Sequence, residues 1–238
     1  RRNLEAEQAD GESFDALREA ALGRWNADLG RIRVEGGTEA QRRVFYTALY
    51  HTLIHPNLLS DVNGEYPLMV GVTEGERYTV FSLWDTYRNV HQLLTLVYPE
   101  RQVEMVRSMI DIYREWGWMP RWELYGRETF TMEGDPAIPV ITDTWMKGLR
   151  DFDIETAYEA FRKSATTPGA QNLLRPDIDP YIERGYIPLG FYAQDLAGDV
   201  SVSHALEYYV ADAALARLAD SLGHREDARL FRDRALGY

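Results

Sequence analysis

A tryptophan, an acid and an arginine lie within five positions of one another in the segment Phe81–Arg88. An indole ring can stack on the face of a pyranose, and a carboxylate and a guanidinium can form directional hydrogen bonds with hydroxyl groups. One interpretation of Trp84, Asp85 and Arg88 is therefore a carbohydrate-binding surface at a loop-to-helix junction. The alternative is structural: Ser82 or Asp85 caps the helix, and Arg88, one turn beyond Asp85, neutralises the acid.

A second aromatic segment contains Trp116, Trp118 and Trp122 within seven residues, which is half of the six tryptophans in the chain. Aromatic clusters beside carboxylates in loops are typical of carbohydrate binding, because one ring face can cover a sugar. The alternative is a hydrophobic plug that closes a ring of helices. Trp122 and the adjoining Glu123 are therefore candidate substrate-binding residues.

Four acids, Glu123, Glu128, Glu133 and Asp135, lie within thirteen residues. Pairs of carboxylates serve as acid and base in glycoside hydrolysis. Carboxylate oxygens are also the ligands that calcium prefers. The spacing does not choose between these chemistries, and the segment Glu133-Gly134-Asp135 also has the form of a charged helix start. Glu128 and Asp135 join the candidate substrate-binding residues.

The composition excludes several classes of protein. The chain of 238 residues has 26 Lys and Arg against 38 Asp and Glu, a net charge of −12, and no cysteine. A surplus of acids argues against nucleic-acid binding, and the lack of cysteine excludes disulfides and thiolate metal sites. No apolar run is long enough for a membrane span. His51 and His55 have no acid between them, unlike the helix of a zinc protease.

The elements that must position these residues are mainly helices. Apolar spacing predicts about eight of them, over residues 10–29, 38–55, 82–97, 100–116, 135–146, 153–164, 201–222 and from 224 onward. Short strands are predicted at 66–72 and 78–81, a loop or hairpin at 118–134 and a long loop at 165–200. Helices joined alternately by short and long loops are typical of hairpins stacked around a ring. We therefore expect an all-α array of helical hairpins that forms an α/α toroid or part of one, with small irregular or β-hairpin insertions.

Local signals predict several helix ends. Thr38 with Gln41 has the spacing of a capping box, and Gly117 stands where a left-handed C-cap would be. Asp135 followed by Pro136 has the form of a capping acid and a first-turn proline. Ser201 is the expected cap of the helix at 201–222.

Long motifs throughout the chain resemble glycoside hydrolase family 92, whose members are calcium-dependent, exo-acting α-mannosidases, mostly bacterial. The resemblance covers Pro56-Asn57, Ser60–Gly64, Phe81–Arg88, Leu93–Leu96, Met119–Trp122, Met132 with Gly134-Asp135, Pro139–Ile141 with Asp143, Lys147-Gly148, Gly185–Pro188, Val202-Ser203 and Leu206–Tyr208. It implies an N-terminal β-sandwich followed by an (α/α)6 barrel, with mannose between the two. Residues 1–37 are then a linker helix, and residues 38–238 are the first part of the barrel.

The resemblance also implies a mechanism and a setting. Trp84 and Asp85 are expected to contact the mannose in the cleaved-sugar subsite, together with Arg88. The family inverts the anomeric centre, and its calcium ion binds vicinal sugar hydroxyls and helps to distort the ring. The implied partners are a mannose-containing glycan and the rest of the parent polypeptide. The implied location is secreted, periplasmic or on the surface of a bacterium, and most calcium ligands are expected outside this chain.

Several family features are absent or altered in this sequence. The family's general acid lies in a Glu-Gly-Asn-Ala-Trp-Gln-Tyr-like motif and its base in an Asn-Asp-Asp-like motif, and neither motif occurs here. We therefore expect no catalytic residue in this chain, and a chain that begins at Arg1 without methionine is expected to be a piece of a longer protein. Asp135-Pro136 stands where many members of the family have Asp-His or a similar pair, and Ala211-Asp212-Ala213 stands where many have Asp-Asp-Trp. The first departure leaves open a mannosyl-phosphodiester substrate.

Two alternatives outside the family remain open at the level of sequence. One is another (α/α)6 glycosidase, similar to a trehalase or glucoamylase, with Glu123 or Glu128 as the catalytic acid. The other is a non-catalytic carbohydrate-binding helical domain.

Overall fold

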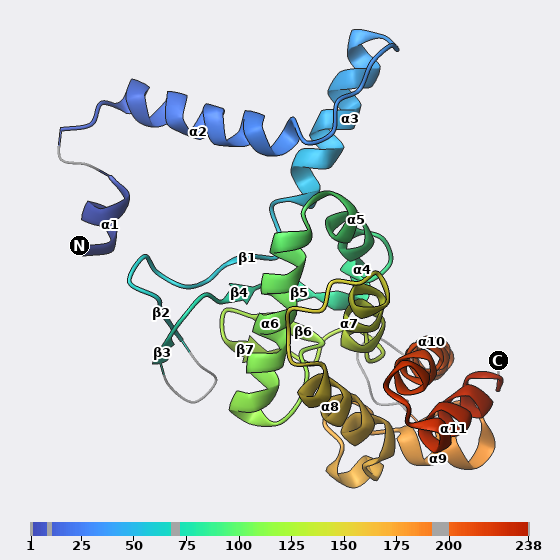
Figure 1. The fold of residues 1–238 in the computed structure, drawn as a ribbon. Helices are drawn as coiled ribbons and strands as arrows, with labels where there is room; N and C mark the ends of the chain where they lie inside the picture. The colour runs from blue at the N-terminus through green and yellow to red at the C-terminus, as the bar shows by residue number, and fades with distance from the viewer. Residues whose placement is uncertain (1, 9–10, 68–71, 192–199, 238) are drawn as a thin grey trace.

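The computed structural model describes residues 2–8, 11–67, 72–191 and 200–237, which are mostly helical with small antiparallel sheets (Figure 1). The helices are α1 (Arg2–Glu7), α2 (Phe14–Leu29), α3 (Glu39–Thr52), α4 (Leu83–Thr86), α5 (Val90–Val97), α6 (Pro99–Trp116), α7 (Ala137–Met146), α8 (Ile154–Thr166), η1 (Gly169–Gln171), α9 (Ile178–Arg184), α10 (Ser201–Leu222) and α11 (Arg225–Ala235). The strands are β1 (Asn57–Leu58), β2 (Glu65–Pro67), β3 (Val72–Glu74), β4 (Tyr78–Thr79), β5 (Phe81–Ser82), β6 (Trp122–Leu124) and β7 (Arg127–Glu128). Among the described residues, no helix combines the length and apolar character needed to cross a membrane.

The N-terminal helices project from the body of the molecule (Figure 1). Helix α2 starts after Ser13, whose hydroxyl accepts a hydrogen bond from the Ala16 amide at 3.2 Å. No side chain of α2 is fully buried, and Phe14 is 79% exposed. Trp25 packs on Tyr50 of α3, with 4.6 Å between the ring centroids. The division at residue 37 into a linker and a barrel stays a prediction.

Several predicted helix ends are confirmed. Thr38 and Gln41 form a reciprocal capping box at the start of α3. Gly117 ends α6 with a φ of 89°, a left-handed conformation that costs glycine little. The helix predicted over 153–164 is α8, which starts at Ile154, and Asp153 caps it by accepting a hydrogen bond from the Thr156 amide. Each of these ends is fixed by a short-range bond or a backbone conformation that one residue type satisfies.

Other predictions about the elements are wrong. The helix expected at 82–97 is two helices, α4 and α5, separated at residues 87–89. The loop expected at 165–200 contains η1 and α9 within its described part. Pro136 occupies the N-cap position of α7, so Asp135 is not the cap, and Ser201 starts α10 without capping it. The single strand expected at 66–72 is two strands, because Pro67 of β2 pairs antiparallel with Val72 of β3; residues 68–71 lie outside the description.

The hydrophobic core lies between helices α5 to α8, α10 and α11. Its fully buried members include Leu83, Val106, Ile141, Phe161, Leu215 and Phe231. Helix α10 packs along α11 and α7, and α5 packs against α6 and α7. This arrangement brings the C-terminal helices beside the segment that follows β5.

A three-stranded sheet of order β5-β6-β7 joins the two segments that the sequence marks for carbohydrate binding. Ser82 of β5 pairs with Trp122 of β6, and Glu123 of β6 pairs with Glu128 of β7. Helix α4 follows β5 directly, so the register of this sheet determines the position in space at which α4 starts.

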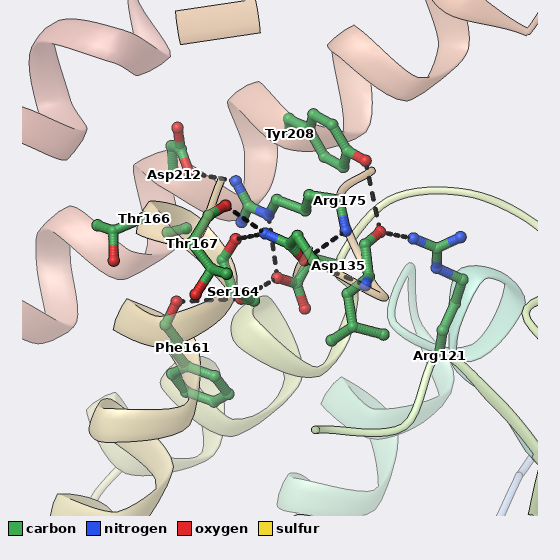
Figure 2. A network of polar contacts seen from close by, with 12 residues as sticks. Arg121, Asp135, Phe161, Ser164, Thr166, Thr167, Arg175, Tyr208 and Asp212 are labelled. Carbon is green, nitrogen blue, oxygen red and sulfur yellow. Dashed lines mark hydrogen bonds and ion pairs between the residues drawn. The ribbon is translucent and has the colours of Figure 1, made fainter. Parts of the chain in front are cut away.

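A buried arginine connects the start of α7 to the C-terminal helices (Figure 2). The Arg175 side chain has no exposed surface; its Nε donates to Asp135 Oδ2 at 3.0 Å and its Nη1 to Asp212 Oδ1 at 2.8 Å. Asp212 Oδ2 also accepts from Tyr181 and from Arg234 Nε of α11. Burial acts to lower the pKa of Arg175, but the charges of Asp212 and Asp135 outweigh it and raise the pKa above its ordinary value.

We predict that Arg175→Met lowers the free energy of unfolding by about 3–5 kcal/mol, because it leaves the buried Asp135 carboxylate without its cation and removes one of the two guanidinium partners of Asp212. Urea denaturation followed by tryptophan fluorescence measures the change. Arg162→Met is the matched control: Arg162 pairs with Asp227 but its side chain is 55% exposed, so we expect a change below about 1 kcal/mol. Equal effects of the two substitutions would contradict the prediction.

Candidate functional site

The segment Trp84–Arg88, here called the 84–88 turn, starts from the three-stranded sheet. The Leu83 amide donates to the Arg121 carbonyl at 3.2 Å, which continues the pairing of β5 with β6. Leu83 is fully buried in the core. The 84–88 turn therefore begins at a strand that is fixed by the sheet. Trp84 and Asp85 lie on the short helix α4, and Arg88 follows its end.

One carboxylate from α10 collects three donors of the 84–88 turn. Glu207 Oε1 accepts from Trp84 Nε1 at 3.2 Å and from Arg88 Nη2 at 2.8 Å. Glu207 Oε2 accepts from the Tyr87 hydroxyl at 2.6 Å. The Glu207 side chain is 13% exposed, so water competes little for these bonds. Glu207 thus orients two aromatic rings and a guanidinium at once.

The Arg88 guanidinium covers both rings of the turn. Its Cζ lies 5.0 Å from the ring centroid of Trp84 and 5.0 Å from that of Tyr87. Such cation–π contacts hold the three side chains as a unit. Burial, the hydrogen bond to Glu207 and the charge of Glu207 raise the pKa of Tyr87, which therefore remains a donor at neutral pH. About half of the Arg88 side chain, 47%, stays exposed to solvent.

Asp85 differs from its neighbours because it is exposed. Its Oδ2 accepts a hydrogen bond from the Ser82 hydroxyl, three residues earlier. This bond holds the carboxylate close to the end of β5 without burying it. The 84–88 turn therefore presents an exposed carboxylate, an indole and a half-exposed guanidinium, which together can stack on a ring and bond its hydroxyls.

Glu123 lies on the same sheet but has no exposed surface. Its oxygens accept from the Thr79 hydroxyl at 2.9 and 3.0 Å, from the Val80 amide at 3.1 Å and from the Gly126 amide at 2.5 Å. Burial raises the pKa of the Glu123 carboxyl, although these hydrogen bonds oppose part of the effect. Val80 has a φ of 61°, an unfavourable value for a β-branched residue. Glu123 therefore braces a strained backbone directly before β5.

Glu128 and Trp122 are joined through the backbone of the hairpin. The Glu128 carboxylate accepts from the amides of Arg121 at 2.9 Å, Trp122 at 3.0 Å and Phe130 at 2.9 Å. The indole Nε1 of Trp122 is buried and has no hydrogen-bond partner among the described residues. Asp135 is buried in the Arg175 network, where it also accepts from Ser164 (Figure 2).

The seven residues predicted to bind substrate thus fall into two groups. Trp84, Asp85 and Arg88 share one turn, in which Asp85 and Arg88 are exposed and Trp84 is partly exposed. The other four stand apart from it: the carboxylates of Glu123, Glu128 and Asp135 accept hydrogen bonds from the protein, and Trp122 belongs to the sheet. Sequence reasoning missed Tyr87 and Glu207. Tyr87 lies inside the Phe81–Arg88 segment. Glu207 lies 119 positions beyond Arg88 and falls within the motif Leu206–Tyr208, but that motif assigns it no role in the site.

One cavity adjoins the 84–88 turn, and a second adjoins residues 130–133. One, of about 440 Å³, is lined by Tyr87, Arg88 and residues of α7 and α10. The other, of about 660 Å³, is lined by Arg121, by residues of the 130–133 and 172–176 segments, and by Val200 and His204 at the start of α10. Phe130 and Met132 have positive φ angles of 55° and 63°, which favour glycine. Strained backbone of this kind gathers at binding sites when the surrounding structure holds it.

Within the described ranges, no three His, Asp or Glu side chains are arranged so that they could hold a metal ion. The carboxylates that the sequence suggests as calcium ligands are engaged elsewhere, with amides for Glu128 and with Arg175 for Asp135. These residues do not fit a calcium site by themselves.

We predict that Gly134→Ala destabilises the protein by at least about 1 kcal/mol more than Gly148→Ala. Both glycines have a left-handed φ, 80° and 88°, so alanine is strained equally at each. A Cβ on Gly134 would lie 2.6 Å from Glu207 Cβ, whereas one on Gly148 meets no atom within 4 Å. Urea denaturation of the two variants measures the difference. Equal destabilisation would show that Glu207 moves aside without cost.

Two solved structures similar to this chain are described as mannosidases of family GH92. An α-mannosidase of family GH92 from Bacteroides thetaiotaomicron, solved with mannoimidazole, matches all of this chain with a TM-score of 0.88 and 33% identity. A family GH92 inverting mannosidase from the same organism matches 98% of the chain with a TM-score of 0.87 and 32% identity. This chain covers 30% and 32% of those two chains.

A more distant relative, 26% identical over 221 residues, is an uncharacterized secreted glycosidase from the fungus Arthroderma benhamiae, of which this chain covers 25%. The model of the glycosyl hydrolase family 92 catalytic domain matches residues 1–238. The chain therefore belongs to glycosyl hydrolase family 92, as part of its catalytic domain.

Proposed function

We propose that the complete protein removes terminal α-linked mannose, with α-1,2 linkages as the preferred substrate, from mannan or N-glycans by calcium-assisted inverting hydrolysis. This chain supplies part of its mannose-binding surface. The observation that carries the proposal is the 84–88 turn, held by Glu207 and lying within a family 92 catalytic domain. The solved relatives support it, because they are mannosidases and their folds match 98–100% of this chain.

Within this proposal, the indole of Trp84 stacks on the mannose ring, and Asp85 and Arg88 bond its hydroxyls. Trp122, Glu123, Glu128 and Asp135 support the surface through the backbone and side chains that they hold. A buried carboxylate whose lone pairs already accept hydrogen bonds from the protein has few acceptor sites left for sugar hydroxyls. Glu123 fixes Thr79 and Val80 by hydrogen bonds, and these residues directly precede strand β5, after which the 84–88 turn begins.

We further propose that residues 38–238 form the first part of an (α/α)6 barrel, that residues 1–37 link it to a preceding β-sandwich, and that the general acid and base lie in the remainder. Family 92 catalytic domains have the (α/α)6 barrel architecture, and this chain covers only about 30% of the solved relatives. The exposed α2 supports a linker role. The family match excludes the alternative of a trehalase-like or glucoamylase-like enzyme.

Family 92 enzymes depend on calcium. Because the described residues of this chain do not form a cation site, we propose that the ligands lie in the rest of the polypeptide. The ion would contribute a positive charge for sugar hydroxyls, and this chain would contribute the surface against which the sugar is held. We also propose that the protein is exported, which its secreted fungal relative supports.

We predict that Trp84→Ala in the complete protein weakens binding of a mannose-based inhibitor roughly tenfold, because it removes the stacking surface. Isothermal titration calorimetry measures the affinity. Trp145→Ala is the matched control, because Trp145 also carries an arginine over its ring, with Arg150 Cζ 4.7 Å from the centroid. An unchanged affinity for Trp84→Ala, or the same loss in the control, would contradict the assignment of the 84–88 turn.

We also predict that residues 1–238 expressed alone do not hydrolyse an aryl α-mannoside, whereas the complete protein does. The reason is that the family's acid and base motifs do not occur in this sequence. Release of the aryl alcohol, followed by absorbance, measures turnover. Clear hydrolysis by the isolated chain would place the acid–base pair inside it.

A further inference from the structure

A buried histidine lies behind the 84–88 turn. His91 of α5 is 1% exposed and contacts side chains on two sides. Its Nε2 lies 3.0 Å from the Thr86 hydroxyl oxygen, and its Nδ1 lies 2.9 Å from Gln102 Oε1 of α6. Thr86 is the last residue of α4 and sits between Asp85 and Tyr87. His91 therefore connects the turn to the helices of the core.

The direction of each hydrogen bond in this series of contacts follows from the Val140 carbonyl, at the end farthest from Thr86. The Val140 carbonyl can only accept, so the Thr144 hydroxyl donates to it at 2.8 Å. The Thr144 oxygen is then free to accept from Gln102 Nε2 at 2.9 Å, which turns the amide oxygen of Gln102 toward His91. Because an amide oxygen only accepts, His91 carries a proton on Nδ1.

The other ring nitrogen is then an acceptor. Burial lowers the pKa of His91 to about 4, and the hydrogen bond with Gln102 and the charge of Asp143 offset only part of this effect. The imidazole is therefore neutral at pH 7, and Nε2 presents a lone pair to Thr86. The single proton of the Thr86 hydroxyl has two acceptors within reach, Nε2 at 3.0 Å and the Ser82 carbonyl at 3.1 Å. Since a buried nitrogen without a donor is costly, the proton serves Nε2.

We propose that His91 is a positioning residue for the 84–88 turn, acting through the Thr86 hydroxyl. The proposal rests on the proposed function of the turn as a mannose-binding surface. The chain from Val140 through Thr144, Gln102 and His91 ends at Thr86, so α6 and α7 set the position of the residue next to Asp85. Glu207 holds the outer side chains of the turn, and His91 holds its inner side. Without the inner contact the turn shifts as a unit, and small shifts of groups that hold a substrate have large effects on rate.

The test compares Thr86→Val with Thr86→Ser in the complete protein, with an aryl α-mannoside as substrate. Valine keeps the shape of threonine without the hydroxyl, whereas serine keeps the hydroxyl without the methyl group. We expect Thr86→Val to lower kcat/KM about tenfold, mainly through a higher KM, and Thr86→Ser to stay within about twofold of the wild type. Partial unfolding would instead lower the apparent kcat and leave KM unchanged.

Thr166→Val is the matched control. The Thr166 hydroxyl, like that of Thr86, lies within hydrogen-bond distance of the carbonyl four residues earlier, at 2.7 Å, but Thr166 is exposed on α8. We expect it to keep wild-type kcat/KM. His91→Asn is the second variant, because its amide N–H can still reach Gln102 while nothing replaces Nε2. We expect it to match Thr86→Val, and the double variant to be no worse than either single one, since both remove the same contact.

Three results would overturn the proposal. Equal losses in Thr86→Val and Thr86→Ser would assign Thr86 a packing role. Wild-type kcat/KM in Thr86→Val, together with a loss in Trp84→Ala, would overturn the role of His91 and leave the proposed function intact. Wild-type kcat/KM in both Thr86→Val and Trp84→Ala would overturn both. If His91→Asn does not fold, the comparison at Thr86 decides alone.

Discussion

The buried guanidinium of Arg175 needs carboxylates beside it, and this need determines how the start of α7 and helix α10 are joined. Arg175 has no exposed surface, and leaving its charge unpaired in the core would cost several kcal/mol. Asp135, just before α7, and Asp212, on α10, supply the compensating charges. Helix α10 also carries Glu207, five positions before Asp212. The pairing that satisfies Arg175 therefore also brings Glu207 to the 84–88 turn.

The 84–88 turn is held from two directions by different kinds of contact. On the inner side it begins at a short sheet whose backbone is braced by the fully buried Glu123. On the outer side, three donors converge on the Glu207 carboxylate. The rings of Trp84 and Tyr87 are thus oriented through their polar edges, and Asp85 stays exposed between the two supports. A surface fixed in this way loses little conformational entropy when a ligand binds.

Sequence reasoning succeeded where a short-range bond or a backbone conformation decides the residue type. The capping box at Thr38 and the left-handed glycine at Gly117 are examples. The same reasoning failed for Asp135, because the carboxylate serves an arginine 40 positions away and not the helix that follows it. Helix α9 was missed because prolines suggested a loop, yet Pro180 lies in its first turn, where a missing amide costs nothing.

The break between α4 and α5 could not be predicted for a similar reason. Apolar spacing continues through residues 82–97, but the side chains of Tyr87 and Arg88 are engaged with Glu207 of α10. Within the candidate site, Trp84, Asp85 and Arg88 were recognisable because they are close in sequence. Glu207 was not, because its place in the site depends on the packing of α10 against α7, which no local pattern encodes.

The separation of Glu207 from the 84–88 turn also has a consequence for the order of events during synthesis. The carboxylate is made 119 to 123 positions after its donors Arg88 and Trp84. At translation rates of about 5–20 residues per second, the turn exists for roughly 6–25 s before its partner has been added to the nascent chain. During that interval an exposed indole and an unpaired arginine are available to other surfaces. The nascent chain therefore passes through a stage in which the side chains of the 84–88 turn are present without their carboxylate partner, and a chaperone that binds aromatic–basic segments would find them then.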